Sequence, residues 1–436
     1  MAELDAIILA GDPLARVRIA GLAAAERAVR VARRVGAERV FVVERDEDRA
    51  GLASWRGARA CPLLVIRADQ LVHTPLVQPL IAALPSAPVA SLVAVVEDLT
   101  AGAASYSGAF VATGALAKSS LDALAAGEAD AAIAARATQT VGHGDIARAP
   151  IATPAERRAA HELLYRILVK PQDNAITRYL YRPVSFPLTR LLVWTPITPN
   201  QISYLVAALV ALGCWLTAHA SWGAALAGTT VLLAASYIDC CDGEVARVKL
   251  LSSRLGAWID TIVDELSTIG YLAALGWHCH LAYGPRYFGD LPFDPWLAGI
   301  AIGTSACAWA MYCIYYNIIV AVGSANSQDY VGRFDVAPGK DASSVRLVPA
   351  APRAIAPARE LPPAIAWLAE YLPYAVRRDF LSWAAVGFAA LDLTQICFAG
   401  FVLGGIVTAA IVTIDHAKLR SLRRSCARRG LVVEAP

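Results

Sequence analysis

The chain has 436 residues, of which 57% are hydrophobic and only 17% are charged, and its mean hydropathy is +0.49. This composition excludes an ordinary soluble domain and indicates a membrane protein. The net charge of +3 is too small to indicate a nucleic-acid partner. The nine cysteines are scattered, so we expect a reducing compartment and no disulfide framework.

Residues 1–155 predict a cytosolic domain that precedes the apolar part of the chain. Short runs rich in Val, Ile and Leu read DAIILAG, ERVFVVE, CPLLVIRAD and PVASLVAVVED. Helical patterns such as GLAAAERAVRVARRVGA and HTPLVQPLIAALP separate them. Strands that alternate with helices predict an α/β, Rossmann-like domain with a mostly parallel sheet, whose buried strands are continuously apolar.

Residues 156–198 predict amphipathic juxtamembrane helices. Arginines interleave with Leu, Tyr and Trp in this stretch, which is typical of a helix lying on an anionic membrane surface. A linker helix packed on the N-terminal domain explains the same pattern equally well.

Residues 199–436 contain six apolar segments: 201–219, 222–246, 256–277, 295–322, 381–395 and 397–414. Because a membrane-spanning helix needs about 20 apolar residues, we predict a six-helix transmembrane bundle. Its last two short segments are expected to form a helical hairpin.

Loop charge predicts the topology of this bundle. Basic residues gather in alternate loops and in the C-terminal tail, which places those loops and both termini on the cytoplasmic side of the cell (inner) membrane. They are Arg247, Lys249, Arg254, Arg333, Lys340, Arg346, Arg353, Arg359, Arg377, Arg378, Lys418, Arg420, Arg423, Arg424, Arg428 and Arg429. The Pro- and Ala-rich segment 326–376 is expected to be partly disordered.

Four aspartates interrupt the second and third apolar segments. Asp239 and Asp242 are three residues apart, and Asp260 and Asp264 are four apart, so each pair shares one face of a helix. Two antiparallel helices would bring all four carboxylates together, and hard divalent cations take such oxygen ligands. Incidental acids at helix ends are the alternative, but these acids keep helical phase on both sides of the intervening turn.

Small residues and one arginine accompany the aspartates. Gly243, Ala246 and Gly256 allow another backbone or a phosphate to approach closely. Arg247 adds a fixed cation that suits a phosphate.

The spacing D239-xx-D242-G243-xx-A246-R247-x8-G256-xxx-D260-xxx-D264 resembles the signature of the CDP-alcohol phosphotransferase (CDP-alcohol phosphatidyltransferase) family. The resemblance implies that the four aspartates hold two Mg²⁺ or Mn²⁺ ions and that Asp264 is also the general base. It further implies a CDP-alcohol site at Gly243, Ala246, Arg247 and Gly256. Asn200 is a further donor-site candidate, because TPITPNQIS resembles the segment before the family's first helix.

The N-terminal domain resembles, more weakly, a sugar-phosphate nucleotidyltransferase. Together the two parts are similar to the bifunctional inositol-phosphate cytidylyltransferase/di-inositol-phosphate-phosphate synthase arrangement. The loop LAGDPLARVRIAGLAAAE has no lysine, and the first lysine of the chain is Lys118. Arg16 or Arg18 is a poor replacement in positioned phosphate chemistry, so a degenerate, catalytically silent domain is predicted, although Asp69 remains a candidate metal ligand.

The resemblance implies a membrane transferase that moves a phosphoalcohol from a CDP-alcohol to an acceptor hydroxyl and releases CMP, in phospholipid or related head-group synthesis. A polar donor such as CDP-inositol or CDP-glycerol, with a lipid or polar alcohol acceptor, is one alternative. CDP-diacylglycerol as donor is another, and a cation-coupled membrane carrier is a third from a different class. A homodimer in contact with membrane lipids is expected, with a separate cytidylyltransferase as a further partner.

Aromatic residues in the fourth apolar segment are candidates for an acceptor pocket. They are Tyr312 and Tyr315, together with the neighbouring Asn317. An aromatic belt at the membrane interface explains the tyrosines as well. His278, Cys279 and His280 have metal-capable side chains, but a polar boundary at the end of a span is the favoured interpretation over a zinc site.

Overall fold

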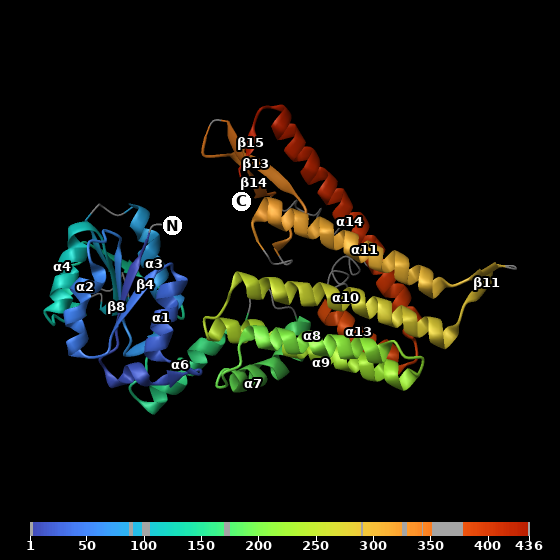
Figure 1. Ribbon diagram of the computed structural model, residues 1–436, viewed down its shortest axis with the longest axis horizontal. Helices are drawn as coiled ribbons and strands as arrows, with labels where there is room; N and C mark the ends of the chain where they lie inside the picture. Colours follow the sequence, from blue (N-terminus) through green and yellow to red (C-terminus); the bar gives the residue numbers. More distant parts are fainter. Residues whose placement is uncertain are drawn as a thin grey trace, which may run out of the picture. The chain divides into compact units, whose positions relative to one another are not determined.

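The computed structural model describes residues 3–86, 90–97, 105–169, 175–288, 291–324, 329–341, 343–350 and 378–434 (Figure 1). The chain divides into two compact units. The first comprises Met1–Asp173, Phe186–Ile197 and Glu244–Leu251, and the second comprises Asn174–Ser185, Thr198–Gly243 and Ser252–Pro436. We call them the N-terminal unit and the helical unit.

The N-terminal unit is built on a six-stranded mixed sheet in the order β4-β1-β5-β8-β7-β9. The strands are β1 (Asp5–Leu9), β4 (Arg39–Val43), β5 (Leu63–Arg67), β7 (Leu92–Val96), β8 (Tyr106–Ala112) and β9 (Gln139–Gly142). The four apolar runs predicted as strands are β1, β4, β5 and β7, and those predictions are confirmed. The sheet is less parallel than predicted, because β8 runs antiparallel to both of its neighbours. Only nine residues, 97–105, separate β7 from β8, fewer than the dozen or so that a crossover between parallel strands needs.

Helices cover both faces of this sheet. They are α1 (Ala24–Arg34), α2 (Leu52–Arg56), α3 (Thr74–Ala83), α4 (Gly114–Ala125) and α5 (Asp130–Ala134). Side chains alternate along β1: Ile8 packs in a core with α1 and α3, whereas Ile7 packs in a second core with α4 and α5. The result is a three-layered α/β domain (Figure 1). Two short strand pairs complete it, β2 (Arg18–Ile19) with β3 (Leu22–Ala23) and β6 (Gln70–Val72) with β10 (Arg148–Pro150).

Helices also form in the predicted juxtamembrane stretch. They are α6 (Pro154–Tyr165), a π-helical turn at Thr177–Tyr181 and α7 (Arg182–Leu192). Thr153 and Glu156 form a capping box that begins α6. Arg190 of α7 lies over the ring of Tyr165 of α6, 4.7 Å from its centroid, so the later part of α7 packs on α6 within the N-terminal unit. Binding to a membrane surface stays a prediction.

The described residues of the helical unit are dominated by six helices, of which α9 ends in the N-terminal unit. They are α8 (Pro199–Thr217), α9 (Trp222–Val248), α10 (Arg254–Tyr283), α11 (Pro295–Asn317), α13 (Arg378–Ala390) and α14 (Thr394–Arg428). Within the described residues, four helices are long and apolar enough to cross a membrane: α8, α9, the helix Pro295–Val322 and α14. These long apolar helices indicate an integral, multi-pass membrane protein.

The other two predicted spans correspond to α10 and α13. Helix α10 is 30 residues long, but Asp260, Asp264 and Glu265 interrupt its first half. It packs against α8, α11 and α14 (Figure 1), so much of its surface faces other helices. Helix α13 has 13 residues, fewer than a straight span needs. A bundle of six spans therefore stays a prediction.

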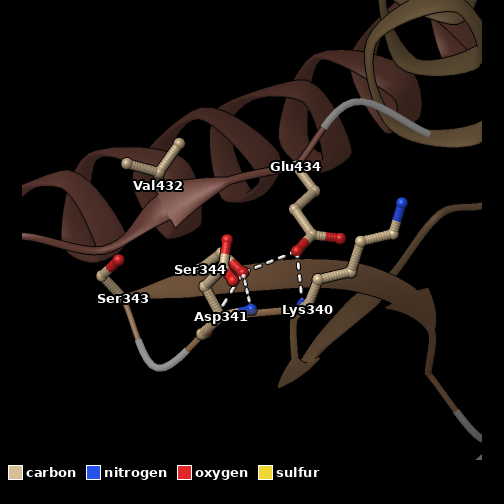
Figure 2. Close-up of a pocket in the computed structure, with 6 residues that line it drawn as sticks. All are labelled: Lys340, Asp341, Ser343, Ser344, Val432 and Glu434. Atoms are coloured by element: carbon tan, nitrogen blue, oxygen red, sulfur yellow. Dashed lines mark hydrogen bonds between the residues drawn. The ribbon is translucent and has the colours of Figure 1, made fainter.

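Part of the segment predicted to be disordered forms strands. β13 (Phe334–Pro338) and β14 (Ser344–Pro349) pair as a hairpin, and the C-terminal β15 (Val432–Val433) adds parallel to β14. The Glu434 carboxylate accepts hydrogen bonds from Ser344 Oγ at 2.5 Å and from the Lys340 backbone N–H at 2.6 Å (Figure 2). The hairpin β11 (Arg286–Phe288) and β12 (Leu291–Phe293) connects α10 to α11. Residues 351–376 lie outside the described residues.

All nine cysteines lie in the described part of the chain, and none forms a disulfide. This agrees with their scattered spacing.

Candidate active site

Three of the four aspartates converge where α9 and α10 meet. Carboxylate oxygens of Asp239, Asp260 and Asp264 lie within 4.8 Å of one another, and each residue is half-buried. The local structure explains this convergence. Ser253 Oγ accepts a hydrogen bond from the Gly256 backbone N–H at 2.9 Å and caps α10, which fixes the helical phase of Asp260 and Asp264.

The fourth aspartate is held separately. Asp242 is 7% exposed, and its carboxylate accepts a hydrogen bond from Ser203 Oγ of α8 at 2.6 Å. Asp239 and Asp264 are close enough to Asp242 to repel its charge. The structure therefore shows three clustered carboxylates and a fourth, more deeply buried one nearby.

The donor set of the cluster fits a hard divalent cation. Oxygen ligands on opposite sides of one Mg²⁺ ion are about 4.2 Å apart, because each lies about 2.1 Å from the metal. Carboxylates spread over 4.8 Å need only small side-chain movements to close on such an ion. Without a cation the like charges repel, so Asp239, Asp260 and Asp264 suit a metal.

Two of the predicted donor-site residues lie side by side. A Cβ atom on Gly256 would approach Asn200 Oδ1 to 3.0 Å and Ser253 Oγ to 3.1 Å. Glycine at this position thus leaves room for the start of α8 against the start of α10.

The remaining donor-site candidates share a face of α9 with Asp239. Gly243, Ala246 and Arg247 are half-buried, as Asp239 is, whereas the intervening Glu244 and Val245 are buried. Their spacing of three and four residues puts them in line along the helix.

The three candidates for an acceptor pocket have different partners. Tyr315 OH donates a hydrogen bond to Glu265 Oε1 at 3.1 Å, next to Asp264 in the chain. Tyr312 is half exposed and stacks with Trp309. Asn317 is buried, and its Nδ2 donates to the Val331 carbonyl at 2.9 Å. Tyr315 is thus linked by a hydrogen bond to the first half of α10, which carries the acids.

The histidines near the end of α10 also have separate partners. His278 Nδ1 lies 2.6 Å from the His219 carbonyl oxygen, and His280 Nδ1 lies 2.5 Å from Asp294 Oδ2. Among the described residues, neither histidine belongs to a group of three side chains that could hold a metal ion, and the polar boundary stays a prediction.

Sequence reasoning missed two hydrogen bonds that support the acids, although it named Tyr315 as a candidate for the acceptor pocket. Ser203 and Tyr315 bond to acids on other helices, 39 and 50 positions away. Neither residue stands at a local spacing from its partner, so no pattern in the chain indicated these bonds.

We expect Ser203→Ala to destabilise the helical unit by about 1–3 kcal/mol, because the buried Asp242 carboxylate loses a hydrogen-bond donor. Thermal unfolding of the detergent-solubilised protein measures this loss. Ser236→Ala is the matched control, since the bond of Ser236 Oγ among the described residues is to the Leu232 carbonyl of its own helix, at 3.1 Å. Equal effects of the two substitutions would contradict the role of the Ser203 bond.

Comparison with known proteins gives a match over the part of the chain that carries the aspartate cluster. The family model described as CDP-alcohol phosphatidyltransferase matches residues 196–376. Two relatives are named bifunctional IPC transferase and DIPP synthase. That of Rubrobacter xylanophilus is 34% identical over 124 residues, 28% of either chain, and that of Thermococcus kodakarensis is 36% identical over 126 residues, 29% of this chain and 28% of the relative.

The third relative is a shorter protein. The phosphatidylinositol phosphate synthase of Corynebacterium glutamicum is 33% identical over 100 residues, 22% of this chain and 43% of the relative. Each similarity thus spans less than half of the relative's length. Residues 196–376, which carry the aspartate cluster, are a CDP-alcohol phosphatidyltransferase domain that follows an N-terminal α/β domain.

Proposed function

We propose that this chain is a metal-dependent CDP-alcohol phosphotransferase of the cell membrane. It moves a phosphoalcohol from a CDP-alcohol to an acceptor hydroxyl and releases CMP. The observation that carries the proposal is the convergence of Asp239, Asp260 and Asp264 within 4.8 Å, inside the domain that the family model matches.

The residues have separate roles in phosphoryl transfer. Asp264 takes the proton of the acceptor hydroxyl, whose oxygen then bonds to the alcohol-bearing phosphorus. The bond from that phosphorus to the bridging oxygen breaks, and the oxygen leaves with CMP. Asp239, Asp242, Asp260 and Asp264 hold two Mg²⁺ or Mn²⁺ ions, which when bound supply positive charge to the diphosphate.

The donor nucleotide is held beside these acids. Gly243, Ala246 and Gly256 leave space for it, and Asn200 and Arg247 offer polar groups to it. Tyr312, Tyr315 and Asn317 are proposed to shape the acceptor pocket. The hydrogen bond from Tyr315 to Glu265 supports that role for Tyr315.

The donor is proposed to be polar, such as CDP-inositol or CDP-glycerol, and the acceptor a lipid or a polar alcohol. The names of the Rubrobacter and Thermococcus relatives support an inositol-type substrate. Transfer from CDP-diacylglycerol is the second candidate, and the likeness to a phosphatidylinositol phosphate synthase favours it.

The N-terminal domain is proposed to be nucleotidyltransferase-like and catalytically silent. Asp69 forms an ion pair with Arg67, so an arginine already neutralises this candidate metal ligand.

The proposed domains are residues 1–155, 156–198 and 199–436. α10 and α13 complete six spans, with both termini and the active site cytoplasmic, and the protein forms a homodimer.

The test uses full-length protein in detergent with Mg²⁺ or Mn²⁺ and a panel of CDP-alcohols with lipid and polar acceptors. CMP release is followed by chromatography and the product by mass spectrometry. We expect release with one donor and acceptor pair, loss in Asp260→Asn, and no change in Asp335→Asn, an exposed carboxylate on β13. A protein that binds no cytidine nucleotide would instead favour a cation-coupled carrier.

A further inference from the structure

We propose that Arg27 and Arg30 of α1 position the catalytic helix α9 by holding its C-terminal end. Both are positioning residues, and the inference rests on the proposed function of the aspartate cluster. The N-terminal unit then has a role in transfer even without chemistry of its own.

Arg27 is an unusual residue for the core of an α/β domain. It is 0% exposed and lies in the inner face of α1 beside Ala28 and Val31. Burial lowers the pKa of Arg27 to about 10, so it remains charged at neutral pH. A buried charge is retained only where good partners replace water.

The partners of this charge include the end of α9. Arg27 Nη1 donates to the Val248 carbonyl at 2.9 Å, and Nη2 donates to the Ile19 carbonyl at 3.2 Å. Arg30 Nη1 donates to the Lys249 carbonyl at 2.7 Å. The last carbonyls of a helix lack partners within the helix and carry partial negative charge, so the two guanidinium groups cap α9 and complement its dipole.

The residues after α9 are also built into the N-terminal unit. Leu250 has a φ of 55°, in the left-handed region, and is 8% exposed within the same core as Ala28 and Val31. Lys249 Nζ donates to the carbonyls of Thr195 at 2.6 Å and Ile197 at 3.1 Å. Hydrogen bonds and packing thus fix the linker between the two halves of the aspartate motif.

This anchor bears on the aspartates through the helix itself. Asp239 precedes Val248 by roughly two and a half helical turns, and unwinding by one residue would rotate it by about 100°. Since Asp260 and Asp264 lie on α10, the linker sets how the two pairs of acids face each other. Loss of the hydrogen bonds from Arg27 and Arg30 therefore weakens metal binding by the aspartates at a distance.

The experiment compares Arg27→Met, Arg27→Lys and Arg30→Met in the full-length protein, with Arg33→Met as the matched control on the exposed face of α1. Two measurements do not depend on enzymatic turnover. They are the Mn²⁺ affinity by electron paramagnetic resonance and the hydrogen exchange of peptides covering residues 237–251. We expect Arg27→Met to weaken Mn²⁺ binding about tenfold and to speed exchange. Arg27→Lys restores part of the affinity, and Arg33→Met changes neither readout.

Each remaining outcome decides a separate question. A folded Arg27→Met protein with wild-type Mn²⁺ affinity and exchange overturns the positioning role. If Arg27→Met does not fold, Arg30→Met decides by the same two readouts, because it removes one partly buried bond to the end of α9 and one exposed ion pair with Glu26. If the wild-type protein binds no Mn²⁺, the proposed function fails, and the exchange of residues 237–251 still shows whether the arginines hold the end of α9.

Discussion

Replacing Asp264 with asparagine should lower CMP release by about 10²–10⁴-fold, the usual contribution of a general base. Asparagine keeps the size of the side chain and one oxygen that can bind a metal, but it cannot accept the hydroxyl proton. Asp264 lies in the half-buried cluster with Asp239 and Asp260, so its charge matters both to the cation and to the proton. Turnover should therefore fall much more than Mn²⁺ affinity.

This difference separates the base from a simple ligand. Steady-state CMP release gives the rate, and an Mn²⁺ titration of the same preparation gives the affinity. Asp335→Asn on β13 is the control, because it makes the same chemical change at an exposed carboxylate. Wild-type turnover in Asp264→Asn would remove Asp264 as the base, and equal losses of turnover and affinity would make it a ligand only.

The features that could be predicted from the sequence are those with a local pattern, either a continuous apolar run or a fixed spacing. The strands β1, β4, β5 and β7 are continuous apolar runs bounded by polar residues. The aspartate pairs are spaced three and four residues apart, so their helical faces follow from the chain alone. The convergence of Asp239 with Asp260 and Asp264 agrees with the antiparallel helices expected from that spacing.

The features that the sequence did not show depend on packing between elements. β8 reads YSGAFVA, and its small residues weaken the strand pattern. Gly108 in this strand has a φ of 89°, and a Cβ there would lie 2.3 Å from Gln70 Nε2. Helix α10 is not among the described helices that are apolar enough to cross a membrane, and its first half carries Asp260, Asp264 and Glu265.

The capping of α9 by α1 illustrates the same limit. Arg27 and Val248 are 221 positions apart in the chain, and α1 looks like an ordinary amphipathic helix with several arginines. Only the fold shows which arginine is buried. The domain boundary near residue 155 likewise hides that Glu244–Leu251 packs with the N-terminal unit.

Removing the α9 ligand from the cluster should have the largest effect on metal binding. Asp239 is the member of the cluster that α9 contributes, whereas Asp260 and Asp264 both belong to α10. Asp239→Ala leaves Asp242 as the remaining proposed ligand on α9, and that carboxylate is buried and already accepts a hydrogen bond from Ser203, so the cation joins the two helices much more weakly. We expect loss of CMP release and a large rise in the Mn²⁺ dissociation constant.

The stability of this variant should change in opposite directions with and without metal. A cation present at 100 times its dissociation constant stabilises the wild-type fold by about 2.7 kcal/mol, and one at its dissociation constant by only about 0.4 kcal/mol. Asp239→Ala should therefore lose most of the Mn²⁺-dependent rise in unfolding temperature. Without metal it should be at least as stable as the wild type, because one of three mutually repelling carboxylates is gone.

Thermal unfolding of both proteins, with excess Mn²⁺ and with chelator, measures all four states. Asp335→Ala controls for the loss of a carboxylate that lies on β13, outside the cluster. An Mn²⁺-dependent rise in Asp239→Ala equal to that of the wild type would show that cation binding does not depend on Asp239. A chelated variant less stable than the chelated wild type would show that the favourable contacts of Asp239 outweigh the relief of repulsion.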